Sequence, residues 1–221
     1  MKYAVGIDIG GTKISVTLGT STGKILARKK IFTRPGARSK ACLKEIVAGV
    51  EIALRESGVP AKRLLGIGVG APGAVNPRKG ILPRSPNLPG WAGIPIARIL
   101  GKKFRLPVYI ANDANAAALG ESVFGAGKRI NDLIYVTVST GVGSGIVIRG
   151  GLHEGAGFVA GEFGHTSIVP EGRKCNCGRL GCLEAYASGT AIARRYHELT
   201  KRKVEGAKEV GTAASKGDKS A

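Results

Sequence analysis

The segment GEFGHTSIVPEGRKCNCGRLGCLEAY, residues 161–186, concentrates the most distinctive chemistry of this 221-residue chain. Its three cysteines, Cys175, Cys177 and Cys182, follow a C-x-C-x₄-C spacing, and His165 is the nearest histidine before them. Zn²⁺ binds Cys sulfur and His nitrogen tetrahedrally, and structural sites fill all four positions with protein ligands. We therefore expect these side chains to hold a structural zinc ion that fixes the shape of a polar, glycine-rich loop.

Other readings of the cysteines stay open. They could pair with one another or with Cys42, although two cysteines in a C-x-C spacing cannot easily bridge each other. The N-terminus shows no secretory signal, and in a reducing compartment such a cluster is more often a metal site than a disulfide framework. His153 also precedes the cysteines and could replace His165 as the fourth ligand.

Two glutamates, Glu162 and Glu184, flank this ligand set, and carboxylates fixed on a loop are suited to accept hydrogen bonds from hydroxyl groups. The segments AGEFGH (160–165) and CNCGRLGCLE (175–184) together resemble the signature of the ROK family of sugar kinases and sugar-responsive repressors. The resemblance implies a structural zinc in this loop. It also implies that Glu162, His165 and Glu184 hydrogen-bond a sugar, while His165 ligates the metal as well.

The N-terminal apolar run reads as two strands joined at Gly10 and Gly11, a pair that predicts a tight turn with positive φ at its centre. A plain hairpin is one interpretation. The motif DIGGT also resembles the first phosphate motif of the actin, hexokinase and Hsp70 superfamily, to which the ROK family belongs. By that resemblance Asp8 would hold Mg²⁺, and backbone N–H groups would face ATP phosphates. The expected nucleotide contacts here are Asp8, Gly10, Gly11, Thr12 and Lys13.

Residues 133–149 repeat this design, with an apolar strand, a Ser/Thr-Gly turn and a second apolar strand. A hairpin with no further role is again the alternative. Taken with the first hairpin, Thr140, Gly141 and Gly143 would form a second phosphate loop. The internal repetition predicts two similarly built domains that face each other.

Between the hairpins the sequence alternates helix and strand patterns. Helices are expected over 39–57 and 96–104, and buried strands over 64–69 and 108–111. The first buried strand runs into GAPG, and by the family resemblance Gly73 lines the sugar cleft. Residues 76–95 read as a long loop without elements, ordered around the single tryptophan, and its Asn87 would reach the sugar in the same way.

The motif NDAN follows the strand at 108–111 and precedes an alanine-rich helix. A carboxylate at the carboxyl end of such a strand faces the crevice where open α/β sheets bind ligands. The plainer interpretation is that Asn112 or Asp113 only caps the helix. The resemblance favours the catalytic one, in which Asp113 accepts the proton of the sugar hydroxyl and Asn112 orients the ring.

The expected fold is α/β and actin/hexokinase/Hsp70-like (ribonuclease H-like), with two domains and a cleft between them. We expect a first domain at 1–111, a second domain with the zinc loop at 112–200, and a solvated helix or tail at 201–221. ROK chains normally continue further. We therefore expect the second domain to be incomplete, which weakens the expectation of nucleotide binding more than that of sugar binding.

The chain carries 34 Lys and Arg against 15 Asp and Glu, a formal net charge of +19. The basic residues are scattered without interleaved aromatic residues, which argues against nucleic acid as a partner. No apolar run is long enough to span a membrane, so a cytoplasmic protein is expected.

These features predict an ATP- and Mg²⁺-dependent kinase that phosphorylates a hexose, glucose first, at the 6-hydroxyl, and that is dimeric in its full-length family form. The alternatives are a non-catalytic sugar-binding remnant and a ROK-type sugar-responsive regulator. Only seven residues precede Asp8, which leaves no room there for a DNA-binding helix-turn-helix.

Overall fold

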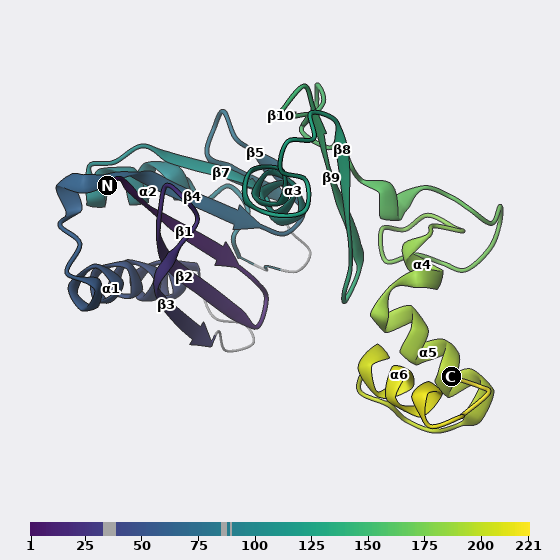
Figure 1. The fold of residues 1–221 in the computed structure, drawn as a ribbon. Coiled ribbons are helices and arrows are strands. Elements are labelled where there is room, and N and C mark those ends of the chain that lie inside the picture. The colour runs from purple at the N-terminus through teal and green to yellow at the C-terminus, as the bar shows by residue number, and fades with distance from the viewer. Residues whose placement is uncertain (33–38, 85–87, 89) are drawn as a thin grey trace.

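The computed structural model describes residues 1–32, 39–84, 88 and 90–221 (Figure 1). A five-stranded sheet with the order β3-β2-β1-β4-β7 organises the N-terminal half. The first three strands form an antiparallel meander, and β4 and β7 then run parallel to β1. The strands are β1 (Tyr3–Ile9), β2 (Lys13–Thr20), β3 (Ile25–Phe32), β4 (Leu64–Ala71) and β7 (Val108–Asn112).

One apolar core lies between this sheet and two helices, α1 (Ser39–Ser57) and α2 (Ile96–Phe104). Side chains of a strand alternate between its faces, so every second residue of β1 and β2 enters the core. The helices contribute residues at helical spacing, among them Ile46 and Val50 of α1 and Leu100 of α2, all fully buried. The short helix η1 (Ala61–Arg63) leads from α1 into β4.

The stretch 76–95 differs from the expected loop without elements. A small hairpin of β5 (Ala74–Asn76) and β6 (Ile81–Arg84) ends within it. Asn76 Oδ1 accepts a hydrogen bond from the Lys79 N–H at 3.0 Å, and Gly80 has φ +66°, so these two residues build the turn. Trp91 is 3% exposed, and its side chain belongs to the main apolar core.

A second, three-stranded sheet has the order β10-β9-β8 and comprises β8 (Leu133–Val138), β9 (Val142–Ile148) and β10 (Gly151–Leu152). Helix α3 (Asp113–Phe124) contacts β4 and β7 on one side and β8 and β9 on the other, so it lies between the two sheets (Figure 1). Small residues allow the close approach. A Cβ at Gly145 would lie 2.6 Å from the Ala118 Cβ and 2.9 Å from the Ala114 carbonyl oxygen.

The remaining elements are η2 (Phe163–His165), α4 (Glu184–Ala187), α5 (Gly189–Thr200) and α6 (Ala207–Ser215). Helices α4 to α6 gather beyond β8 and β9, away from the five-stranded sheet (Figure 1). Tyr196 is buried and donates a hydrogen bond to Asp218 at 2.7 Å, which ties the end of the chain to α5. Leu199, near the end of α5, is 56% exposed. Among the described residues, no helix has both the length and the apolarity needed to cross a bilayer.

Candidate active site and metal centre

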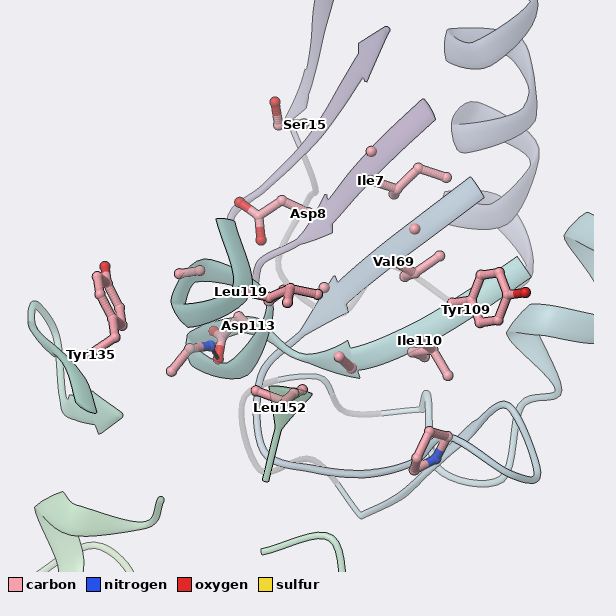
Figure 2. A pocket seen from close by; sticks show the side chains of 18 of the residues that line it. Ile7, Asp8, Ser15, Val69, Tyr109, Ile110, Asp113, Leu119, Tyr135 and Leu152 are labelled. Carbon is pink, nitrogen blue, oxygen red and sulfur yellow. Dashed lines mark hydrogen bonds between the residues drawn. The ribbon is translucent and has the colours of Figure 1, made fainter. Parts of the chain in front are cut away.

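A cavity of about 900 Å³ lies between the five-stranded sheet, α3 and the second sheet (Figure 2). Asp8 reaches it from the end of β1, and Asp113 reaches it from the first turn of α3. The carboxyl ends of the parallel strands β1, β4 and β7 meet at one sheet edge, which brings these two residues together although they are 105 positions apart in the sequence.

The two carboxylates interact electrostatically. The pKa of Asp8 is raised, first by partial removal from water and then by the negative charge of Asp113, while Lys13 opposes the shift. Two ionised carboxylates repel each other, and a cation bound beside them would relieve that repulsion. The donor set fits the predicted Mg²⁺ contact at Asp8.

Asn112 caps α3, as the plainer interpretation of the NDAN motif predicted. Its Oδ1 accepts hydrogen bonds from the N–H groups of Ala114 at 2.9 Å and Asn115 at 3.1 Å. Its Nδ2 donates to the Gly73 carbonyl at 3.2 Å, so two predicted sugar-site residues lie in contact. A role for Asn112 in orienting a sugar ring stays a prediction, as does the role of Asp113, which is exposed on the cavity.

The first glycine turn forms where it was expected, but the reason given for its glycines was wrong. In this described part of the chain, Gly10 and Gly11 do not adopt the left-handed conformation that a primed turn requires. The Gly10 N–H instead donates to the Lys13 carbonyl at 2.9 Å, and a Cβ on Gly10 would lie 2.8 Å from that oxygen. Close backbone approach, and not positive φ, therefore explains this glycine.

The turn between β8 and β9 accepts hydrogen bonds from the first residues of α5. The Gly189 N–H donates to the Ser139 carbonyl at 2.7 Å, and Thr190 Oγ1 donates to the Thr140 carbonyl at 2.8 Å. Gly143, expected in this loop, lies inside β9, where a Cβ would be 3.2 Å from the Ala114 Cβ. Its small size therefore serves the packing of α3 on the sheet.

The four expected metal ligands come together. The ligand atoms of His165, Cys175, Cys177 and Cys182 all lie within 4.8 Å of one another. The sulfurs of Cys177 and Cys182 are 3.7 Å apart, and the Cys175 sulfur is 3.7 Å from His165 Nδ1. Two bonds of about 2.3 Å to a tetrahedral Zn²⁺ place sulfurs about 3.8 Å apart, so the spacing fits this ion. All four cysteines of the chain are free thiols, and the histidine of the cluster is His165.

The Cys175 thiol of this cluster is buried. Burial raises the pKa of the Cys175 thiol to about 12. A bound cation would displace that proton, because the thiolate is the form that ligates metals. His165 presents Nδ1 to the cluster, and its Nε2 lies 3.8 Å from Glu162 Oε2. A carboxylate beside the second nitrogen is the usual partner of a metal-bound histidine.

Glu184 joins the metal loop to the second hairpin. Its Oε2 accepts a hydrogen bond from the Val142 N–H at 2.9 Å, and its Oε1 lies 3.7 Å from the Cys175 sulfur. A Cβ on Gly141 would displace the same carboxylate, so glycine at this position leaves room for Glu184. Binding of a sugar by Glu184 stays a prediction, and it would compete with or rearrange this backbone contact.

Glu162 lies close enough to the other acidic groups for their charges to affect its pKa. Its pKa is raised, mainly by partial burial; His165 opposes the shift, and the charges of Asp113 and Glu184 add to it. The predicted sugar-site residues Glu162, His165, Glu184 and Asp113 therefore form one electrostatic neighbourhood. Asn87, the remaining sugar-site prediction, lies outside the described residues.

Several cavity residues escaped the sequence reasoning. Tyr135 and Thr137 of β8 and Ser139 after it line the cavity, as does Glu154 beyond β10. The alternation of the strand at 133–138 carried the signal for the first two, because Thr137 lies two residues before the Ser-Thr-Gly turn and Tyr135 shares its face. Glu154 follows a two-residue strand, which is too short to be recognised from sequence.

The sequence matches the ROK family over residues 4–221. It is 38% identical over 201 residues to a xylose repressor of Caldicellulosiruptor bescii, which covers 91% of this chain and 50% of that protein. It is 39% identical over 194 residues to a glucokinase of Halalkalibacterium halodurans, covering 87% of this chain and 58% of the relative. The chain thus spans about half to three-fifths of the length of these two relatives.

The fold is also found among solved structures. A ROK family glucokinase from Streptomyces griseus in complex with glucose and AMPPNP superposes with a TM-score of 0.79 at 36% identity. The match covers 99% of this chain and 72% of that structure. The expected actin/hexokinase/Hsp70-like α/β fold is therefore confirmed, and the chain belongs to the ROK family.

Proposed function

We propose that this chain is the sugar-binding and phosphate-facing part of an ATP-dependent hexose kinase that phosphorylates the 6-hydroxyl of a hexose, with glucose as the first candidate. One observation carries the proposal. Asp8 and Asp113 face the same cavity between the sheets, and the charge of Asp113 contributes to the raised pKa of Glu162 on the metal loop. The similarity to a glucokinase and to a structure holding glucose and AMPPNP supports the same assignment.

In the proposed reaction the hexose O6 forms a bond to the γ-phosphorus while the bond from that phosphorus to its bridging oxygen breaks, and ADP leaves. Asp113 accepts the O6 proton, a contribution of about 10²–10⁴ in rate. Bound Mg²⁺, held by Asp8 through water, would neutralise phosphate charge. The phosphate contacts that we propose are Gly10, Gly11, Thr12, Lys13, Thr140, Gly141 and Gly143.

The hexose would be held by hydrogen bonds to polar groups of the metal loop and of the segments beside Asp113. We propose Glu162, His165 and Glu184 from the metal loop, Asn112 and Gly73 from the β5–β7 side, and Asn87. The zinc ion on His165, Cys175, Cys177 and Cys182 would be structural, because the cluster uses all four of its positions for protein ligands.

Replacing Asp113 tests the assignment. Asp113→Ala should lower ADP release in the presence of hexose by about 10²–10⁴ while hexose binding, measured by calorimetry, and zinc content stay unchanged. Glu121→Ala on the solvent side of the same helix is the control, since that position is exposed and far from the first turn. Undiminished turnover in Asp113→Ala would remove the general base from the proposal.

A second candidate is a sugar-responsive regulator, which the similarity to a xylose repressor favours. The same assay separates the two candidates. Heat of sugar binding without ADP release over a panel of hexoses and xylose would identify a sugar-binding module without kinase activity.

We further propose a cytoplasmic location, because clustered thiols stay available to a metal in a reducing compartment, and a homodimer for the full-length form. We divide the chain into domains at 1–111 and 112–200, followed by a terminal segment at 201–221. The position of α3 between the two sheets supports the first boundary.

A further inference from the structure

Glu162 sits at the centre of a three-residue turn. Its φ and ψ are −72° and 49°, and the Phe163 N–H donates to the Gly161 carbonyl at 2.7 Å. These values define an inverse γ-turn. Gly161 enters the turn with φ +85°, and a Cβ on it would lie 2.8 Å from the Ser144 carbonyl oxygen. The turn that presents Glu162 is therefore built directly against β9 at Ser144.

The Ser144 hydroxyl contacts both ends of this turn. It donates to the Gly161 carbonyl oxygen and accepts from the Phe163 N–H at 3.3 Å. These two groups belong to the peptide planes immediately before and after the Glu162 Cα, so one hydroxyl restrains both φ and ψ of Glu162. Ser144 is 4% exposed, and solvent therefore offers little replacement for these contacts.

We propose that Ser144 is a positioning residue that clamps the Gly161–Phe163 turn and so aims the Glu162 carboxylate at the bound hexose. This inference rests on the proposed function, in which Glu162 accepts a hydrogen bond from a sugar hydroxyl. The carboxylate already lies 3.8 Å from His165 Nε2, on the side of the metal cluster. Without the clamp the turn would have to be ordered during binding, and that cost would weaken affinity.

The test uses the full chain loaded with zinc, with glucose and MgATP titrated separately by calorimetry. Ser144→Ala should weaken glucose binding about tenfold and leave MgATP binding unchanged. Ser144→Thr keeps the hydroxyl and should restore glucose affinity. Ser122→Ala is the matched control, because its hydroxyl lies on α3 and donates to the Leu119 carbonyl at 2.9 Å in an exposed hydrogen bond. Glucose binding unchanged in Ser144→Ala, or an equal loss for glucose and MgATP, would overturn the inference.

Amide hydrogen exchange provides a readout that needs no ligand. Ser144→Ala should speed exchange at the Phe163 N–H and leave the Val142 N–H, which is bonded to Glu184, unchanged. If the wild-type chain binds no hexose at all, the proposed function fails, and this measurement decides the clamp by itself. Faster exchange at Phe163 then supports it, and unchanged exchange refutes it.

Discussion

At the scale of the single residue, the metal ligands are the best-determined part of the site. Spacing predicted Cys175, Cys177, Cys182 and His165 as one set, and the structure brings all four together. The prediction succeeds because zinc accepts few residue types as ligands, and because these residues lie close together in the sequence. The contact partners of Glu184 could not be predicted in this way. Its bond to the Val142 N–H joins residues 42 positions apart, and such a pairing depends on the tertiary fold.

Cys177→Ala should abolish stable metal binding, because three of four ligands cannot close a structural site. Zinc measured by mass spectrometry after dialysis should fall from about one ion per chain to near zero. Cys42→Ala is the control, since Cys42 is buried in the core between α1 and the sheet. Retention of zinc by Cys177→Ala would assign the fourth position to another group.

At the scale of the element, the sequence predicted the regular strands and helices well and the short ones poorly. Helix α2 was expected at 96–104 and spans those residues, because apolar positions at helical spacing define it. The strands β5 and β10 were missed, since three and two residues carry no periodicity. The packing of α3 on β9 could not be predicted from the sequence either. It is possible because Gly143 and Gly145 lie opposite the alanine-rich helix.

Gly145→Ala tests that packing. The added methyl would meet the Ala118 Cβ and the Ala114 carbonyl, and overpacking of this kind costs about 1–3 kcal/mol. Urea unfolding should show that loss. Gly211→Ala in α6 is the matched control, because open space surrounds that position and alanine should be neutral or stabilising by about 0.5–1 kcal/mol. Equal stability of the two variants would contradict the close approach of α3.

The ion pair between Arg173 and Glu198 ties the metal loop to α5, with two contacts at 3.0 and 2.6 Å. The hydrogen bond from Arg173 lowers the pKa of Glu198 below its ordinary value of 4.5. A carboxyl with a lowered folded-state pKa stabilises the fold above its unfolded pKa, and this stabilisation is lost as pH falls through the folded value. The stability difference between wild type and Glu198→Gln should therefore be constant above pH 4.5 and shrink below it. Thermal unfolding from pH 7 to 3 measures this, and a difference independent of pH would rule out the ionised pair as its source.

At the scale of the whole molecule, the apolar core is divided unevenly along the chain. The main apolar core belongs to the five-stranded sheet with α1 and α2, while the metal loop has only a small cluster of Cys175, Cys182, Ala185 and Tyr186. The overall fold could be predicted because two glycine hairpins and one motif-rich loop identify the family. The cleft between the domains was expected as well, but Tyr135, Thr137 and Glu154 in its walls could not be predicted, since they come from segments that are distant from Asp8 and Asp113 in the sequence.

Removing the metal should therefore act on one part of the molecule. In the presence of a strong chelator, amide protection should fall across residues 163–187 and persist in β1, β2 and β4, because those strands bury their side chains in the main core. Hydrogen exchange followed by mass spectrometry resolves the two regions. Uniform loss of protection would mean that the metal loop stabilises the entire fold.

The distance of 3.7 Å between the Cys177 and Cys182 sulfurs matters for how the protein is purified. Cys177 is exposed, and its sulfur needs to move by less than 2 Å to reach the disulfide bond length of about 2.05 Å. In protein purified without zinc, air would close that bridge and remove two ligands at once. Preparations should accordingly be kept under reductant until the metal is added, and a batch that fails to bind zinc should be assayed for lost thiols.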